Sequence, residues 1–534
     1  MKPQLFRSLK GYQKGDLLKD LMAGLMVAII ALPLSIALGI QSVPAEVSNY
    51  GIQYGIITAI VAGFFISALG GSKHQIGGPT AAFVVILFGY LADPKIGVLG
   101  LAIAGMMAGG LLILMGFLKV GNVMKFFPYP ITIGFTTGIG VTLLVGQIKD
   151  FCGFTASGTE TFAKLISYAQ NIATFDLATF GIGALGLLCV ILLPKISKKI
   201  PAAFVALIVC TGATLLLNGL AGTEIATIGS KYGEVKAGFF PVDFKGIKEV
   251  HFGSLIVPAI VIAFLCAIES LLSATVAAGM TGTEFDANQE LVGQGAANIF
   301  SSLLGGLPAT GAIARTAASI ENGAKSPLAG MFHSVFLLVM YFALMGVMKF
   351  IPLAVFSAIL ISVAINMSRF PLFIKLTRFG VRDVTVLLVT FVLTVAFDLT
   401  YGVLGGVAVT FLVNAKNLFK GLKIEKIKTA EGDETNEAVE TVERNPAPVK
   451  TVRLKISGAL FFLNANKLAV AIAKELETAS LVVVDMKDVD SVDETALEKL
   501  VALDKKINPT EKNIDLVEYN EKIGKRFQKY FDVL

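Results

Sequence analysis

Residues 305–316 read GGLPATGAIART and place one arginine, Arg315, inside a long apolar part of the chain. Residues 77–91, GGPTAAFVVILFGYL, have a similar opening of glycine, proline and threonine. The apolar part of each segment is about ten to thirteen residues long, too short for a helix to cross a hydrocarbon core of about 30 Å. Segments of this kind break a membrane helix near mid-depth, where protein or water must satisfy the freed backbone groups.

The composition divides the chain into an apolar part and a water-soluble part. Of the 534 residues, 54% are hydrophobic and 16% are charged, which excludes an ordinary soluble domain. The first 420 residues hold 27 Lys and Arg against 18 Asp and Glu, and residues 421–534 hold 18 against 21. We therefore expect a transmembrane domain at 1–420, a charged linker at 421–449 and a small soluble domain at 450–534. No cleavage site follows the first apolar run, so this run is expected to remain as a helix.

Twelve apolar runs are candidates for membrane-spanning helices. They cover residues 20–40, 53–71, 97–118, 129–148, 177–194, 202–219, 254–279, 290–306, 328–349, 351–367, 383–397 and 400–419. With the two short segments the count is fourteen, and each short segment is the third span of its half. This correspondence predicts an α-helical polytopic membrane protein built as a 7+7 inverted repeat, because an odd number of spans reverses the second half.

Positive charge in the loops predicts the orientation of these spans. Lysine and arginine gather in alternate loops, near residue 73 and at 118–125, 194–199, 324–327 and 368–382. The positive-inside rule places these loops, and with an even span count both termini, on the cytoplasmic side of the inner membrane. The acidic stretch 281–290 does not fit, although acidic residues carry little weight in the rule.

The short segments and Arg315 together predict an anion site. A helix N-terminus has unpaired N–H groups and a positive field equivalent to about half an elementary charge. If the second helix begins near Thr310 or Gly311, Arg315 lies about one turn in and reaches back toward that point. Thr80 and Thr310 are candidate N-caps or hydroxyl donors. Symmetrical repeats would bring both helix starts and the guanidinium to one small volume that suits an anion. The alternative is that Arg315 only pairs with a carboxylate or carbonyl in packing.

Glu269 is the other costly residue, since it lies inside the apolar run 254–279. Three roles are open: a proton carrier, a Na⁺ ligand together with Ser270, Ser273 or Thr275, or a structural counter-ion of Arg315. Gln41 is a candidate polar lining of the pathway, or a side chain that ties two helices together.

The sequence has no pattern typical of an enzyme. The four cysteines and three histidines are scattered, and no nucleophile–base set or phosphate loop is visible. We expect no catalytic residue, no metal site, no nucleic-acid partner, and no cofactor beyond a coupling ion, H⁺ or Na⁺.

Several blocks of the membrane part resemble the sulfate permease (SulP) family of anion transporters. In chain order they read IALPLSIALGIQSVP, GGPTAAFVVIL, GFTTGIG, AIESLLSATVAAGMTG, ELVGQGAANI, GGLPATGAIARTA and LISVAINMS. The resemblance implies a core domain of spans 1–4 and 8–11, a gate domain of spans 5–7 and 12–14, and elevator-like movement of the core against the gate. Members of the family move sulfate, bicarbonate, C4-dicarboxylates, chloride or related anions.

The resemblance also implies where the anion binds. The positions carried over from the third span are Thr80, Ala81, Ala82 and Phe83, and those from the tenth span are Ala312, Ile313, Ala314, Arg315 and Thr316. Glu269 matches the acidic position of the eighth span.

The last 85 residues alternate strand and helix patterns, which predicts a small α/β domain. The expected strands read TVRLKISG, ALFFLN, SLVVVDM and NIDLVEY, and the expected helices cover 465–476, 494–506 and 520–531. The pattern resembles the STAS domain. Asp493 and Thr495 lie at a strand-to-helix corner that is phosphorylated in some regulators, so Thr495 is a candidate switch, with a plain N-cap as the alternative. Ala496, where Gly is usual, weakens the switch interpretation. We expect this domain to pack on a second copy or on the cytoplasmic face, in a homodimer.

Two functions of different class follow. The first is a secondary active transporter of a small anion, coupled to H⁺ or Na⁺. The second is an anion-responsive membrane sensor or channel-like element that signals through the STAS domain.

Overall fold

The computed structural model describes most of the chain. The described residues are 2–121, 128–155, 158, 161–197, 200–378, 380–397, 399–418, 422–427, 451–461, 464–476, 479, 481–493, 496–497, 500, 513–517 and 524. They fold into two compact units. The first comprises Met1–Lys125, Phe135–Phe370 and Phe391–Val403, and the second Phe126–Gly134, Pro371–Thr390 and Leu404–Leu534.

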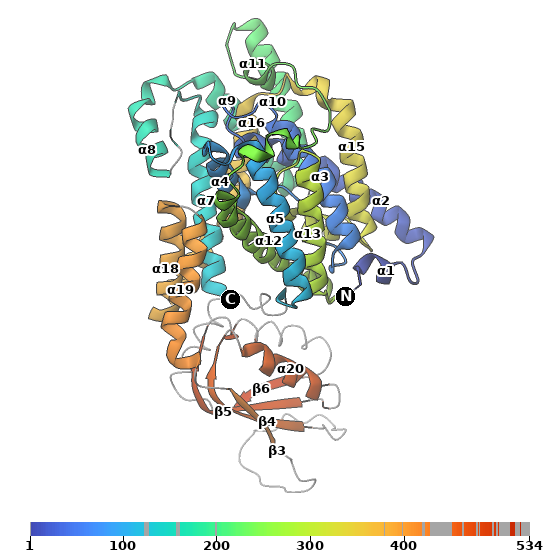
Figure 1. The fold of residues 1–534 in the computed structure, drawn as a ribbon, viewed down its shortest axis with the longest axis vertical. Coiled ribbons are helices and arrows are strands. Elements are labelled where there is room, and N and C mark those ends of the chain that lie inside the picture. The colour runs from blue at the N-terminus through green and yellow to red at the C-terminus, as the bar shows by residue number, and fades with distance from the viewer. Residues whose placement is uncertain are drawn as a thin grey trace. The chain divides into compact units, whose positions relative to one another are not determined.

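Each predicted span corresponds to a helix whose ends differ from the prediction by a few residues (Figure 1). These helices are α2 (Lys14–Ser42), α3 (Gly51–Leu69), α4 (Ala81–Ala92), α5 (Gly97–Phe117), α7 (Tyr129–Cys152), α9 (Leu177–Ile196), α10 (Ala202–Leu220), α12 (Phe252–Thr281), α13 (Ala287–Leu303), α14 (Ile313–Glu321), α15 (Leu328–Met348), α16 (Leu353–Met367), α18 (Val381–Ala396) and α19 (Leu399–Leu418). By length and composition, nine helical segments of the described chain could cross a membrane alone. The polytopic fold is therefore confirmed, and the count of fourteen stays a prediction.

Several short helices were not predicted, because none is long or apolar enough to read as a span. They are α1 (Gln4–Ser8), α8 (Thr161–Gln170), α11 (Ile228–Tyr232), α17 (Phe370–Leu376) and the 3-10 turns η1 (Ile172–Thr174) and η2 (Phe244–Glu249).

Close backbone contacts join the helices around the two short ones. A Cβ added to Gly109 of α5 would lie 2.6 Å from the carbonyl oxygen of Gly295 in α13, and one added to Gly55 of α3 would lie 2.1 Å from that of Ser35 in α2. Small residues allow membrane helices to approach this closely and to gain dispersion contacts. Helix α15 packs on both α2 and α3, so these five helices form a tightly packed group.

A second group consists of α9, α10 and α16, which pack on one another and meet the first group through α2. Gly186 of α9 fits against Ala358 of α16 and Cys210 of α10, with a Cβ added there lying 3.2 and 3.3 Å from these two side chains.

Two buried carboxylates tie loops to this packing. Asp20 of α2 accepts hydrogen bonds from the backbone N–H groups of Lys325 and Ser326 at 2.5 and 3.1 Å, and from the hydroxyls of Ser326 and Tyr12. Glu290 of α13 holds the loop after α3 in the same way. Asp20 is fully buried, so each of its lone pairs that meets a donor offsets a large desolvation penalty.

The carboxylate of Glu290 accepts hydrogen bonds from the N–H groups of Gly71 and Ser72 at 2.8 and 3.0 Å, and from the Gln294 amide at 2.8 Å. These bonds hold the loop that leads from α3 toward α4. The position of α4 therefore depends on α13, more than 200 residues further along the chain.

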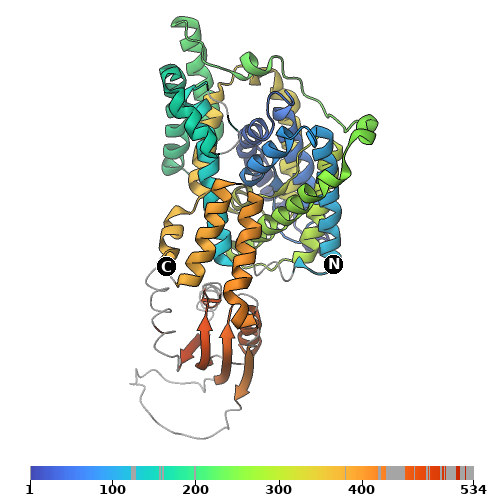
Figure 2. The ribbon, with the colours of Figure 1, turned by 60° about the vertical axis from the view of Figure 1, so that its left-hand side comes forward.

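The second unit contains a four-stranded sheet, β3 (Lys423–Ile427), β4 (Thr451–Leu460), β5 (Leu481–Val492) and β6 (Asn513–Val517), whose strands lie side by side in this order (Figure 2). Strand β3 is antiparallel to β4, and β4, β5 and β6 are parallel. Apolar residues of β4 and β5 pack with Leu468 and Ile472 of α20 (Ala465–Glu475).

Two predictions for this unit are wrong. Strand β3 lies inside the segment predicted as a linker, 421–449, because its three charged residues and two isoleucines suit an edge strand. ALFFLN is not a separate strand: its first two residues complete β4. The Asn464 amide then donates to the carbonyl of Ala459 and accepts from the N–H of Phe461, which closes a turn before α20.

The last two predicted helices, 494–506 and 520–531, and the candidate switch Thr495 lie largely or wholly outside the described residues. The carboxylate of Asp493 accepts a hydrogen bond of 2.8 Å from the N–H of Ala496. This bond is typical of an N-cap and engages Asp493 at the end of β5.

Candidate anion-binding site

The starts of the two short helices are joined by a two-stranded antiparallel ladder. Strand β1 (Gly77–Gly78) precedes α4, strand β2 (Thr310–Gly311) precedes α14, and Gly78 pairs with Thr310. The N–H of Ala312 also donates to the carbonyl of Ile76 at 2.9 Å. The predicted convergence of the two helix starts is thus confirmed. We call these strands, with the first turns of α4 and α14, the junction.

Arg315 reaches back from α14 to the start of α4. Its guanidinium donates to the carbonyl of Gly77 at 3.1 Å and to the hydroxyl of Ser35 in α2 at 3.2 Å. The side chain is 2% exposed, and no described carboxylate forms an ion pair with it. The buried positive charge of Arg315 therefore lies at the junction without a neutralising carboxylate among the described residues. Its electrostatic field can act on an anion that binds there.

Gly78 makes room for this guanidinium. Its φ of +150° lies in a region that side-chain-bearing residues rarely adopt, and an added Cβ would lie 1.9 Å from Arg315 Nη1. Glycine is required here by both backbone conformation and close approach.

Glu269 of α12 also lies at the junction. The hydroxyl of Thr80 donates to its carboxylate at 2.9 Å, and the side chain is partly exposed. The described side chains contain no ion pair between Glu269 and Arg315. The two charged groups thus have separate partners: Glu269 meets α4 through Thr80, and Arg315 meets β1 and α2.

Of the two roles predicted for Thr80 and Thr310, N-cap or hydroxyl donor, the structure shows the hydroxyl donor and no side-chain capping bond. Thr80 occupies the N-cap position of α4, but its hydroxyl bonds to Glu269 and makes no capping bond. Thr310 lies in β2, two residues before the N-cap Ala312, and its hydroxyl bonds to Ser270 and to the carbonyl of Cys266. Neither threonine hydroxyl accepts a hydrogen bond from the first N–H groups of its helix, so both helix starts are without a side-chain cap.

Ser270 and Ser273 attach α14 to α12. The Ser270 hydroxyl accepts from the N–H of Gly311 at 3.1 Å, and that of Ser273 donates to the Thr316 hydroxyl at 3.4 Å. Thr316 also accepts from the N–H of Ile76 at 3.1 Å. Both serines are fully buried and engaged in these contacts.

The remaining predicted positions differ in accessibility. Ala81, Ala82, Phe83 and Ala312 are buried, whereas Ile313 is partly exposed and Ala314 is exposed. Together with the partly exposed Thr80 and Glu269, these two are the accessible residues at the junction.

The structure does not place Gln41 at the junction. Gln41 lies near the end of α2, where its amide donates to Asp150 of α7 at 3.2 Å. Conversely, the acceptors of Arg315, Ser35 and the carbonyl of Gly77, were missed by sequence reasoning. Ser35 follows Pro33 within an otherwise apolar run, and such a polar residue is the one signal that could have identified it.

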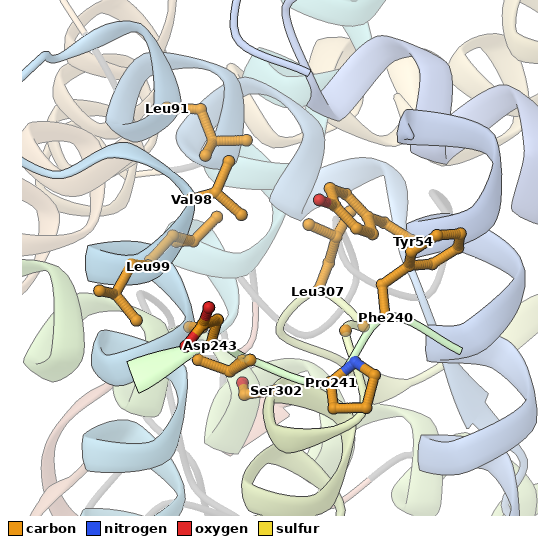
Figure 3. Close-up of a pocket in the computed structure, with 14 residues that line it drawn as sticks. Tyr54, Leu91, Val98, Leu99, Phe240, Pro241, Asp243, Ser302 and Leu307 are labelled. Carbon is orange, nitrogen blue, oxygen red and sulfur yellow. The ribbon is translucent and has the colours of Figure 1, made fainter. Parts of the chain in front are cut away.

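A separate cavity of about 270 Å³ is lined mainly by apolar side chains, including Leu91, Val98 and Leu307, and also by Tyr54 and Asp243 (Figure 3). Its lining includes neither Arg315 nor Glu269. The described residues contain no cluster of three or more His, Cys, Asp and Glu side chains that could hold a metal ion.

Comparison with known proteins identifies both parts of the chain. Residues 17–390 match the sulfate permease family, and residues 439–530 match the STAS domain. A putative sulfate transporter of Bacillus subtilis, YvdB, is 39% identical over 422 residues, which cover 79% of this chain and 78% of the relative. The bicarbonate transporter BicA of Picosynechococcus sp. is 30% identical over 479 residues, covering 87% and 81%.

Solved structures agree with these matches. The transmembrane domain of a cyanobacterial bicarbonate transporter, BicA, superimposes with a TM-score of 0.66 at 28% identity, covering 73% of this chain and 98% of that one. The structure of SLC26A9 superimposes with a TM-score of 0.69 at 18% identity, covering 99% and 89%, and supports the fold alone. The chain therefore belongs to the sulfate permease family of anion transporters and carries a STAS domain at its carboxyl end.

Proposed function

We propose that this protein is a secondary active transporter that binds a small oxyanion at the junction and carries it across the cell membrane. The observation that carries the proposal is the pairing of β1 with β2, which brings two uncapped helix starts together in front of the buried Arg315 guanidinium. Free N–H groups, two helix dipoles and one cation provide both the donors and the positive field that an oxyanion requires.

Sulfate, bicarbonate and a C4-dicarboxylate are the candidate substrates. All three present carboxylate-like or sulfate oxygens to N–H donors, and relatives of this chain are described as sulfate and as bicarbonate transporters. The accessible residues of the junction, Thr80, Glu269, Ile313 and Ala314, would surround the anion.

Transport is proposed to follow an elevator mechanism. Helices α2, α3, α5, α13 and α15 are locked together by close backbone contacts, which favours their movement as one body. Helices α9, α10 and α16 form the group against which this body would move. A junction held by α2, α12 and α13 would then travel with the first group.

Glu269 is the proposed coupling residue. It is partly exposed at the junction and bonds directly to Thr80, the residue at the start of α4. A carboxylate in this position either takes up a proton with the anion or contributes an oxygen to a Na⁺ site. Ser270 and Ser273 support this arrangement by fixing α14 to α12.

Both termini are proposed to face the cytoplasm, and two chains to form a homodimer. The basic loops named above support the orientation. Accessibility of cysteines introduced near either terminus tests it, and the mass of the purified protein in detergent tests the dimer.

Uptake by the purified full chain in liposomes tests the proposed function. Labelled sulfate, bicarbonate and succinate are offered at two pH values, with and without Na⁺. Arg315→Ala should reduce uptake by about a hundredfold, because a charge-assisted site loses its cation. Arg315→Lys should retain part of it, and Arg7→Ala, in the exposed α1, should behave as wild type.

Glu269→Gln separates the coupling roles. If Glu269 carries the proton, the variant loses the pH dependence of uptake; if it binds Na⁺, it loses the Na⁺ dependence. Anion binding without accumulation in the wild type, together with signalling that requires residues 421–534, would replace the transporter proposal with the sensor alternative.

A further inference from the structure

A second cavity, lined by several charged side chains, lies at the end of the first unit where α2 and α7 end. It has a volume of about 480 Å³. One wall comes from the last turn of α2, the segment that follows it, and the end of α4; the other comes from α7, α8 and α11. In Figure 1, α8 and α11 lie at the upper end of this unit, and the N-terminus lies at the lower end. We call this space the far-end cavity.

The far-end cavity contains more cations than anions. Lys149, Lys164 and Lys231 line it, against Asp150 and Glu46. Asp150 already has two partners: Lys231 at 3.8 Å and the Gln41 amide at 3.2 Å. Glu46 is exposed. Lys149 and Lys164 have no ion-pair partner among the described side chains.

The charge of Lys149 acts on Lys164. Burial is the larger cause that holds the pKa of Lys164 below its ordinary value, and the positive charge of Lys149 is the second. The Lys164 ammonium also lies 5.5 Å from the centre of the Phe88 ring of α4. Two like charges on a partly buried surface repel, and a bound anion between them would remove this repulsion.

The cavity and the junction lie at opposite ends of α4. Residues 88 and 92, near its end, line the cavity, and Thr80 at its start belongs to the junction. Thr80 and Ala92 are twelve residues apart along α4, about 18 Å at about 1.5 Å per residue. The carboxyl end of a helix repels anions, so an anion at this end needs cations beside it. Lys149 and Lys164 supply them.

We propose that the far-end cavity is a second anion site, in which Lys149 and Lys164 hold an oxyanion before it reaches the junction. The site is distinct from the transport site and shares no residue with it. Its role in uptake rests on the proposed transport function, whereas its occupancy by an anion does not.

Protection from acetylation tests occupancy. The full chain in liposomes is treated with a membrane-impermeant acetylating reagent, and modification of Lys164 is followed by mass spectrometry. Sulfate and bicarbonate are added in separate arms at constant ionic strength. Either anion should slow the modification of Lys164 several-fold and leave Lys248, an exposed lysine of η2, unchanged. Arg315→Ala should show the same protection, and Lys149→Gln should lose it.

Kinetics test the role in transport. Lys164→Gln and Lys149→Gln should each raise the KM for uptake from the side of the membrane on which the far-end cavity lies, by about three- to tenfold. The kcat should stay within about twofold, because a nearby charge mainly affects capture of the anion. Lys248→Gln is the matched control and should match wild type.

No protection of Lys164 by either anion, or equal slowing at Lys248, would overturn the second site even if wild-type uptake is normal. Protection in Arg315→Ala without any wild-type uptake would support the second site and contradict the transporter proposal. Unchanged KM values in both lysine variants would show that the far-end cavity has no role in capturing the anion.

Discussion

The hydroxyl of Thr80, at the start of α4, donates a hydrogen bond of 2.9 Å to the carboxylate of Glu269 in the middle of α12. This bond links the residue that begins one short helix to the acidic residue of a long one, 189 positions apart. In the transport cycle proposed above, this bond would connect a cation or proton at Glu269 directly to the helix start that is proposed to face the anion.

Loss of this hydrogen bond should impair transport. Thr80→Val keeps the shape of the side chain but removes the donor, and a hydrogen bond to a charged group contributes about 1.5–3 kcal/mol. We expect uptake to fall about tenfold or more. Thr80→Ser retains the hydroxyl and should stay within about threefold of wild type. Equal uptake by the Val and Ser variants would show that the bond has no part in transport.

Gly78→Ala should disrupt the junction. The new Cβ would lie 1.9 Å from Arg315 Nη1, and the backbone conformation at φ +150° disfavours any side chain. We expect loss of most anion binding, measured by a thermal shift with added anion. Gly89→Ala, in the helix α4 that follows β1, meets open space and should leave binding unchanged. Normal anion binding in Gly78→Ala would contradict the close contact described here.

Asp20→Asn should destabilise the first unit. The amide replaces an acceptor that satisfies two backbone N–H groups and two hydroxyls, and loss of such a buried carboxylate costs about 2–4 kcal/mol. We expect a lower Tm in detergent. Asp16→Asn in the same helix removes only an exposed contact of 3.8 Å with Lys19. The two variants should differ by several degrees; identical melting curves would refute the role of Asp20.

Stability of the STAS sheet should depend on Asp485. Burial acts to raise the pKa of this carboxyl, but the Lys487 N–H and the Arg453 guanidinium at 2.9 Å together hold it below the ordinary value. Asp485 therefore stabilises the fold above its ordinary pKa of about 4, and this contribution is lost as the pH falls through the lower folded pKa.

Hydrogen exchange of β5 in the full chain measures this effect. At pH 7, Asp485→Asn should lose about 1–3 kcal/mol of protection, and the difference from wild type should shrink as the pH falls below about 4. Asp488→Asn breaks the more exposed pair with Lys455 and should cost less than about 1 kcal/mol. A loss for Asp485→Asn that persists unchanged at low pH would exclude the ionic contribution.

Much of the membrane fold follows from the length of the apolar runs. Each of the twelve runs became a helix, and the two short Gly/Pro/Thr segments became α4 and α14. Hydrocarbon thickness sets these lengths, so composition alone predicts them. Strand β3 was missed because an edge strand faces water and has a charged, linker-like composition.

The site was only partly predictable. The meeting of the helix starts follows from their equivalent places in the two halves, but side-chain partners depend on tertiary contacts. Thr80 was predicted to be an N-cap or a hydroxyl donor, and only the folded chain brings Glu269 within reach of its hydroxyl. Polarity left two roles open for Gln41, a lining of the pathway or a tie between two helices, and the fold places its amide on Asp150 of α7. Polarity identifies costly residues in a membrane but does not locate their partners.

Protection of residue 314 tests the central claim, that the anion binds at the junction of α4 and α14. Ala314 is exposed there, so Ala314→Cys can be alkylated and its modification followed by mass spectrometry. The transported anion should slow this reaction several-fold, while Val470→Cys, on the exposed face of α20, should react at an unchanged rate. Equal rates at residue 314 with and without the anion, in protein that still transports it, would contradict the account.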